Sequence, residues 1–197
     1  TPDALGPKVV SKLMITRHLT NMMPGSIDES INSVCSLAPG VLGTTGIETL
    51  EIIKGLVDRI KPQMVICIDA LASRKMERIN RTIQIGNTGI APGAGVGNKR
   101  KEININSLGV PVIAIGVPTV VDAATIANDT LDLFLKEINK YTKEESNLYK
   151  MLSSVDGRQR ERMIREILNP YVGDLMVTPK DVDAHIEGIS KIISTGL

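Results

Sequence analysis

Asp69 is the residue of this sequence best placed to do chemistry. It directly follows the apolar run 64–68, which is short, rich in β-branched residues and therefore expected to be a buried strand. In layered α/β sheets ligands bind at the carboxyl ends of strands, where a carboxylate is desolvated on the strand side and its pKa tends to rise. The spacing is equally consistent with Asp69 capping a helix that begins near Ala70, and the two roles are compatible.

Asp3 is a second carboxylate, and its own surroundings say little. It lies in the segment Thr-Pro-Asp-Ala-Leu-Gly-Pro at residues 1–7. An Asp after a Pro is ordinarily a turn or helix-capping residue, so on this context alone we interpret Asp3 as structural. The sequence by itself does not bring Asp3 to Asp69.

A glycine-rich stretch with cationic residues after it covers residues 86–101. Five glycines fall within twelve residues, which indicates backbone that is exposed, closely approached or in the left-handed region. A nucleotide-binding or phosphate-binding loop over 86–100 is one hypothesis. However, Walker A needs Gly-Lys-Ser/Thr, and no Gly-x-Gly-x-x-Gly opens a helix here. A shaped surface loop is the simpler interpretation, and a loop lining a peptide groove fits better than either.

The remaining candidates for chemistry are weak. His18 and His185 lie far apart, outside any metal-ligand spacing, and no Gly-x-Ser-x-Gly elbow is present. Cys35 and Cys67 each sit in an apolar run without a cationic neighbour, so we interpret them as reduced, buried small residues of an intracellular protein. Carboxylate chemistry is left as the best enzymatic interpretation, with no metal ligand set and no cofactor expected.

Strand and helix patterns alternate along the first two thirds of the chain. Buried strands are predicted at 64–68 and 110–115, with weaker candidates at 12–18, 31–37 and 81–85. Amphipathic helices are predicted at 47–60 and 121–138. This order predicts an α/β fold: a three-layer α/β/α sandwich with a mainly parallel sheet, of the phosphorylase/hydrolase-like kind.

The chain changes character near residue 140. Residues 140–147 are polar and indicate a linker, and charged helices are predicted at 158–168 and 181–193. We therefore expect a catalytic core over 1–139 and a helical C-terminal appendage over 140–197 that packs on it.

Composition excludes several classes of protein. The 197 residues carry 23 Lys and Arg against 22 Asp and Glu, a formal net charge of +1, with 42% hydrophobic residues. A globular chain with this balance is not typical of a nucleic-acid binder, and three Tyr, one Phe and no Trp leave few rings on which bases could stack. No apolar run reaches the length of a membrane span, so we expect a cytoplasmic protein without membrane or direct nucleic-acid partners.

Several long blocks of the sequence resemble the germination protease family of spore-forming bacteria, and the resemblance covers essentially the whole chain. These blocks, beside Thr-Pro-Asp-Ala-Leu-Gly-Pro at 1–7, are Pro-Gly-Val-Leu-Gly-Thr-Thr-Gly-Ile-Glu at 39–48, Ile-Asp-Ala-Leu-Ala at 68–72, the run 93–102, Gly-Val-Pro-Val-Ile-Ala-Ile-Gly-Val-Pro-Thr-Val-Val-Asp-Ala at 109–123 and Leu-Met-Val-Thr-Pro-Lys at 175–180.

The resemblance implies an endopeptidase that degrades small acid-soluble spore proteins at germination, in the spore core. It implies a zymogen, a homotetramer, a relationship to the hydrogenase maturation proteases, and a catalytic pair formed by Asp3 and Asp69. Members of the family carry a further region before the Thr-Pro-Asp loop, so the resemblance implies that the sequence is part of a longer protein. It also implies a loop near 141–151 that is shorter here.

On this basis the hypothesis is water activation by the two aspartates, one protonated and one ionised. Gly93, Gly95 and Gly97 would hold the substrate backbone, and Lys99 and Arg100 would attract an acidic substrate. The alternatives left open are a metal-assisted peptidase like the maturation proteases, the nucleotide-binding module over 86–100, and an inactive structural domain.

Overall fold

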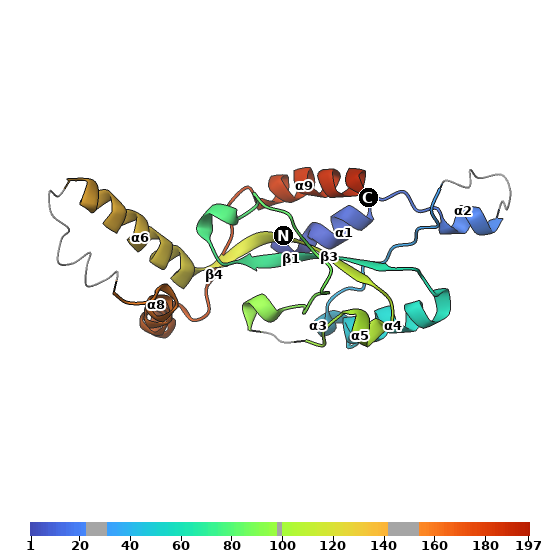
Figure 1. The fold of residues 1–197 in the computed structure, drawn as a ribbon, viewed down its shortest axis with the longest axis horizontal. Coiled ribbons are helices and arrows are strands. Elements are labelled where there is room, and N and C mark those ends of the chain that lie inside the picture. The colour runs from blue at the N-terminus through green and yellow to red at the C-terminus, as the bar shows by residue number, and fades with distance from the viewer. Residues whose placement is uncertain (23–30, 98–99, 142–153) are drawn as a thin grey trace. The chain divides into compact units, whose positions relative to one another are not determined.

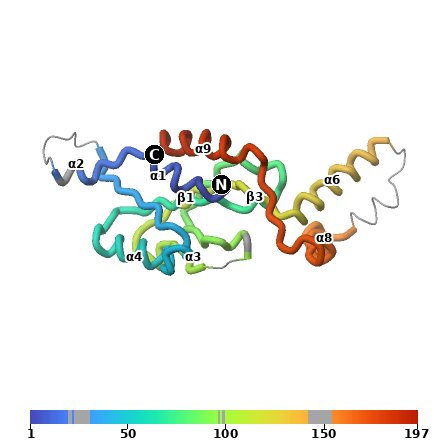
Figure 2. The backbone as a smooth tube through the Cα atoms, turned by 180° about the vertical axis from the view of Figure 1, so that it is seen from behind, coloured from blue at the N-terminus to red at the C-terminus, as the bar shows by residue number. Residues whose placement is uncertain are grey.

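A computed structural model describes residues 1–22, 31–97, 100–141 and 154–197 (Figures 1 and 2). The chain divides into two compact units: Thr1–Ala70 with Ile83–Val117 and Asp181–Leu197, and Leu71–Thr82 with Pro118–Lys180. The elements in chain order are η1 (Pro2–Ala4), α1 (Leu5–Val10), α2 (Arg17–Met22), α3 (Leu42–Thr45), α4 (Thr49–Ile60), β1 (Val65–Ser73), η2 (Met76–Arg78), β2 (Gln84–Gly86), η3 (Ala94–Val96), α5 (Ile105–Leu108), β3 (Val112–Asp122), α6 (Ala123–Tyr141), α8 (Gly157–Val172), β4 (Met176–Val177) and α9 (Val182–Gly196).

The four strands form one mixed sheet in which β3 is central. The order is β1-β3-β2, with β4 also paired to β3. The Val65 N–H donates to the Pro111 carbonyl oxygen (2.9 Å), so β1 and β3 start side by side and run in the same direction. The β2–β3 and β3–β4 pairs are antiparallel, with Ile85 opposite Ile115 and Val121 opposite Val177. The mixed α/β class is confirmed, whereas the expectation of a mainly parallel sheet is wrong for the described strands.

Helices of the first unit cover both faces of the β1–β3 pair (Figure 1). On one face, buried residues of α1, α9 and β3 form a cluster that includes Leu5, Val9, Ile115 and Ile186. On the other face, α4, α5 and the starts of both strands form a second cluster around Val57. Because side chains of a strand alternate between faces, the continuous apolar runs of β1 and β3 can supply both clusters.

Most predicted helices are confirmed, with shifted ends, as α4, α6, α8 and α9. No helix in the described part of the chain is long and apolar enough to cross a membrane. The polar linker predicted at 140–147 lies outside the described residues from 142 onward.

Two of the weaker strand predictions are wrong. Residues 12–18 contain a turn and the start of α2. Residues 31–37 form no strand. Thr16 Oγ1 donates to the Asn32 carbonyl and accepts from the Val34 N–H (2.9 Å), and the Thr16 and Arg17 N–H groups donate to the Val34 carbonyl (3.1 and 3.0 Å). Apolar composition alone does not separate a strand from a segment held by such local hydrogen bonds. The third weak candidate is confirmed in part, as the short strand β2.

The second unit is held by polar contacts between α6 and α8. Thr125 Oγ1 donates to Glu161 Oε1 (2.9 Å), and Arg160 Nε donates to Asn128 Oδ1 (2.8 Å). Asp129 accepts the Met76 N–H (2.9 Å) and pairs with Lys75 (3.0 Å), which ties α6 to η2. Buried polar groups are tolerated when they are hydrogen-bonded, and Thr125, Asn128 and Asp129 of α6 each have such a partner.

The glycine-rich stretch is a loop closed at its base. Ile90 and Ile103 exchange both backbone hydrogen bonds (2.9 and 2.8 Å), and Asn104 then caps α5 through the Ser107 N–H (3.0 Å). Gly89 enters this base at φ +86°, and a Cβ there would lie 2.2 Å from the Ile103 carbonyl oxygen. Only glycine fits this position without a shift of the backbone.

Gly89→Ala is expected to destabilise the folded state by about 2–4 kcal/mol, because the new methyl group collides with backbone and the positive φ is strained. Urea unfolding measures the change. The matched control is Gly188→Ala on α9, where a Cβ meets nothing within 4 Å and the helix favours alanine. Equal unfolding midpoints for the two variants would contradict the account of the loop base.

Candidate active site

The N-terminal segment lies against the free edge of β1 in the described part of the chain. A Cβ on Gly6 would stand only 3.0 Å from the Ile68 carbonyl oxygen, so α1 approaches the strand backbone closely. Since the Val65 N–H points to β3, the backbone groups of residues 66, 68 and 70 point away from β3. The same segment carries Asp3 in η1, one turn before Gly6. The close approach at Gly6 therefore positions Asp3 along the edge that carries Asp69.

Asp69 lies within β1, which continues to Ser73. The Ala70 N–H donates to Asp69 Oδ1 (2.9 Å). This hydrogen bond satisfies a backbone group that points away from β3. The prediction that Asp69 follows the end of a strand, and the alternative that it caps a helix from Ala70, are both wrong. The neighbouring strand β3 has eleven residues, so pairing extends β1 past the short apolar run visible in the sequence.

The environment of Asp69 favours its protonated form. Burial raises the pKa of the Asp69 carboxyl from 3.8 to about 6, the Ala70 N–H lowers it, and the negative charge of Asp3 raises it further. Asp3 itself is exposed. The negative charge of Asp3 therefore acts on Asp69 in the folded chain, an electrostatic interaction that the sequence alone does not show. A half-buried carboxyl beside an exposed one is an arrangement suited to acid–base chemistry.

Cys67 lies two residues before Asp69 on the same strand and is partly buried. Burial, and then the charge of Asp69, raise the pKa of the Cys67 thiol to about 11. The thiol is protonated at neutral pH, so it is not a nucleophile. Cys35, in contrast, is exposed, which corrects the expectation that both cysteines are buried.

The predicted substrate-binding residues lie on the closed loop. Gly93 (φ +73°) and Gly97 (φ +76°) flank the single turn η3, which contains Gly95. These two positions require the left-handed backbone conformation that glycine adopts without strain. Arg100 is half-buried, and Lys99 lies outside the described residues.

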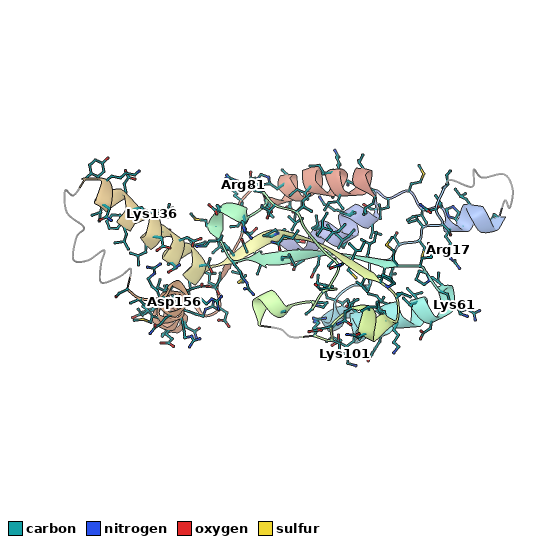
Figure 3. The ribbon with its side chains drawn as sticks, viewed as in Figure 1. Arg17, Lys61, Arg81, Lys101, Lys136 and Asp156 are labelled. Atoms are coloured by element: carbon teal, nitrogen blue, oxygen red, sulfur yellow. The ribbon has the colours of Figure 1, made fainter. Side chains whose placement is uncertain are left out.

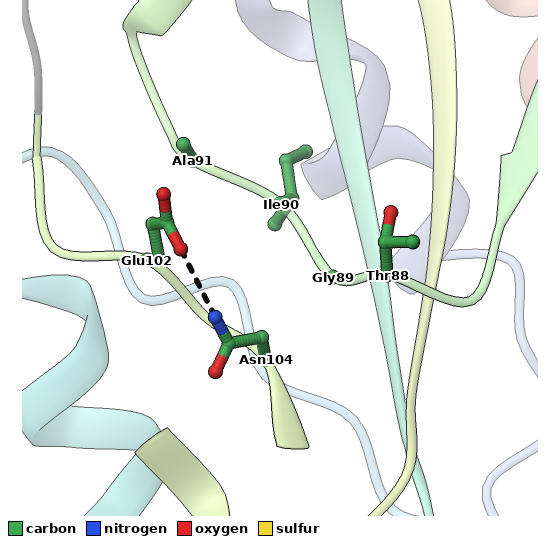
Figure 4. A pocket seen from close by; sticks show the side chains of 6 residues that line it. All are labelled: Thr88, Gly89, Ile90, Ala91, Glu102 and Asn104. Atoms are coloured by element: carbon green, nitrogen blue, oxygen red, sulfur yellow. Dashed lines mark hydrogen bonds between the residues drawn. The ribbon is translucent and has the colours of Figure 1, made fainter. Parts of the chain in front are cut away.

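A cavity of about 200 Å³ lies at the base of this loop (Figure 4). It is lined by Thr88, Gly89, Ile90, Ala91, Glu102 and Asn104. The Asn104 side-chain amide donates to Glu102 Oε2 (3.1 Å), so the polar groups of the cavity already bond each other. Neither Asp3 nor Asp69 lines it.

The loop lacks the structure that binds phosphates. Among the described residues between β2 and β3, those in helical turns belong to η3, with three residues, and α5, with four. The start of α5 is occupied by the Asn104 cap. A phosphate site needs a longer helix with free N–H groups at its start. This geometry argues against the nucleotide-binding alternative.

His18 and His185 take no part in the site. His18 lies on α2 and not at the end of a strand, and it is exposed. His185 on α9 pairs with Asp181 (3.0 Å) one turn earlier. Within the described ranges, no three His, Cys, Asp or Glu side chains are grouped closely enough to hold a metal ion.

The electrostatic contact between the two aspartates predicts a coupled titration. Asp3→Asn removes a negative charge near Asp69 and is expected to lower the pKa of Asp69 from about 6. Carboxyl ¹³C NMR of the two proteins measures the shift. Asp58→Asn on the exposed face of α4 is the matched control and should leave the titration unchanged. An Asp69 midpoint that is identical in wild type and Asp3→Asn would disprove the contact.

Asp69 also makes stability depend on pH. Below a pH of about 4 the carboxyl is protonated in both states and costs nothing, whereas above about 6 the folded state must hold a partly buried charge. Asp69→Asn is therefore expected to stabilise the protein by up to about 3 kcal/mol near neutral pH. The gain should disappear as the pH falls toward 4. Urea unfolding across this range tests it, and a gain independent of pH would contradict the assignment.

Comparison with known proteins covers the whole chain. The family model for germination protease matches residues 1–156 and 141–197. Germination proteases of Clostridium tetani and Clostridium acetobutylicum are 66% and 60% identical over 197 residues, which is all of this chain and 61% and 60% of theirs. That of Bacillus cereus is 44% identical over 228 aligned positions, which again include all of this chain and 62% of the relative.

Two features of these matches bear on the length of the chain. The two matched segments overlap at residues 141–156, the region where the sequence indicates a shorter loop than in the family. The clostridial relatives align over 197 positions, whereas the Bacillus cereus relative needs 228. The chain spans about three fifths of the length of these relatives. Because the match extends from residue 1, in the segment that carries Asp3, to residue 197, the chain belongs to the germination protease family.

Proposed function

We propose that this chain is the greater part of an endopeptidase that starts the degradation of small acid-soluble spore proteins at germination. The observation that supports the mechanism is the pKa of Asp69, raised to about 6 with the charge of Asp3 among its causes. Family membership supports the reaction class and the kind of substrate.

In the proposed mechanism the two carboxyl groups share one proton. Asp69, partly buried beside Cys67 in β1, is the partner that holds the proton, because burial disfavours its charged form. Its O–H donates a hydrogen bond to the carbonyl oxygen of the scissile peptide bond. Asp3, which is exposed, accepts a proton from the attacking water. The water oxygen bonds to the carbonyl carbon, and Asp3 passes the proton that it accepted to the leaving nitrogen as the C–N bond breaks.

The glycine-rich loop is the proposed substrate-binding element. Gly93, Gly95 and Gly97 lack side chains around an exposed turn, so an extended peptide can approach their backbone groups directly. Lys99 and Arg100 follow the turn and supply positive charge toward an acidic substrate.

The resemblance supports further proposals about the longer protein. These are a zymogen activated by removal of an N-terminal segment, a homotetramer, residence in the spore core, and a three-layer sandwich with a C-terminal helical part over 140–197. Helices on both faces of the β1–β3 pair support the layered arrangement.

The test is cleavage of a small acid-soluble spore protein by the full-length processed enzyme. Asp3→Asn and Asp69→Asn are each expected to lower kcat/KM by at least about 100-fold, because each removes one half of the proton relay. Asp58→Asn is the matched control on an exposed helix face. The rate should rise as the pH falls toward about 6, where Asp69 takes up the proton that the mechanism requires.

Two outcomes would overturn the mechanism. Full cleavage by either Asp→Asn variant would show that the aspartate pair is not required for catalysis. Activity lost to a chelator and restored by a divalent ion would replace it with metal-assisted hydrolysis, in which a third ligand would come from outside the described residues.

A further inference from the structure

Helix α8 concentrates positive charge in its first three turns. Arg158, Arg160, Arg162 and Arg165 fall within eight residues. Two of these side chains are used inside the unit: Arg160 pairs with Asp132, and Arg165 pairs with Asp122 (3.0 Å). These two contacts stabilise the α6–α8 pair. Arg158 and Arg162 take no part in them.

Arg158 and Arg162 line a hollow of about 310 Å³ together with Arg165 and Glu161. The spacings of four and three residues place the three arginines on one face of α8, and all three are exposed. Glu161 accepts from Thr125 (2.9 Å) and pairs with Arg165 (3.4 Å). Among residues 1–22, 31–97, 100–141 and 154–197, no carboxylate forms an ion pair with Arg158 or Arg162. The hollow thus holds three guanidinium groups against one carboxylate that is already engaged.

The position of the hollow at the start of α8 adds to its positive potential. Asp156, marked at this end of the helix in Figure 3, accepts the Arg158 N–H (3.2 Å) and caps the helix. The first turn itself contains no acidic residue. A helix N-terminus carries a partial positive charge that repels cations, so Arg158 stands where an isolated helix would favour an acid. A bound anion would remove this repulsion.

We propose that the hollow formed by Arg158, Glu161, Arg162 and Arg165 binds carboxylates of an acidic segment of the protein substrate. The proposal rests on the proposed function, whose substrate is a protein. Guanidinium groups bind carboxylates through paired N–H donors, and two unengaged groups one turn apart suit two acidic side chains of one peptide. A nucleic acid is a poorer fit, because the hollow is small and the chain has a net charge of +1 and four aromatic residues.

The test compares Arg158→Gln/Arg162→Gln with Lys54→Gln/Arg59→Gln in the full-length protein. The control pair lies exposed on α4 and removes the same charge. Fluorescence anisotropy measures binding of a labelled glutamate-rich peptide and of the same peptide with glutamines. The α8 variant is expected to bind the glutamate peptide about tenfold more weakly, with little change for the glutamine peptide or for the control.

Steady-state kinetics separate this proposal from the catalytic one. On an acidic protein substrate the α8 variant should raise KM by a similar factor and leave kcat unchanged, because the proposal gives these arginines a role in substrate binding and none in bond cleavage. Peptide binding is measured without cleavage, so its result does not depend on whether the Asp3 and Asp69 variants are active. Arg158→Lys/Arg162→Lys keeps the charge and should recover part of the affinity.

Three results would overturn the proposal. Equal losses in the α8 and control variants would indicate a general charge effect. Unchanged binding of the glutamate peptide by the α8 variant would show that the hollow is not the binding site. An unlabelled single-stranded oligonucleotide that displaces the peptide, and binds more tightly through the same arginines, would make the ligand a nucleic acid. Urea unfolding of each variant shows that a loss is not a folding defect, since neither substituted arginine has an ion pair within the described residues.

Discussion

The close approach of α1 to the edge of β1 is the constraint on which the first unit depends. Gly6 lies so near the Ile68 carbonyl that a methyl group would be in tight contact with it. This approach allows Leu5 and Val9, both fully buried, to pack with α9 and β3 in one core cluster. The same segment carries Asp3 to the edge where Asp69 lies. The close approach of Gly6 to the Ile68 carbonyl therefore contributes both to the packing of the core and to the assembly of the candidate site.

The candidate site lowers the stability of the folded state, because Asp69 is partly buried. A carboxyl in the middle of β1 takes the place of an apolar side chain, and its pKa of about 6 is a measure of the burial that its charged form resists. The surrounding structure offsets the cost through two apolar clusters on opposite faces of the β1–β3 pair. Cys67 shares the strand and remains a neutral thiol, so the negative charge near Asp69 comes from Asp3. Enzymes commonly place such groups where folding alone would not favour them.

The two units are stabilised in different ways. The first has continuous apolar clusters, whereas α6 buries Thr125, Asn128 and Asp129. These polar side chains are matched by partners such as Glu161, Arg160 and Lys75. A polar interface is specific in geometry but gains less from burial than an apolar one. Arg160 and Arg165 form ion pairs at this interface, whereas Arg158 and Arg162 form none within the described residues.

Local pattern determined much of this protein. Periodic apolar residues located α4 and α6, charged helical segments located α8 and α9, the apolar runs located the cores of β1 and β3, and the motif blocks placed the chain in its family. Sequence also singled out Asp69 as a candidate residue. Tertiary structure decided what local pattern does not encode. Pairing with β3 carried β1 past Asp69, hydrogen bonds to Thr16 and Arg17 held residues 31–37 without forming a strand, and two of the three described strand pairs proved antiparallel. Gly6 gave no local signal, because the atom that crowds a Cβ there belongs to Ile68, distant in the sequence, whereas Gly89 lies in the glycine-rich stretch where such backbone was expected. The contact between Asp3 and Asp69 likewise spans more than sixty residues, so only the folded chain could raise the pKa of one through the charge of the other.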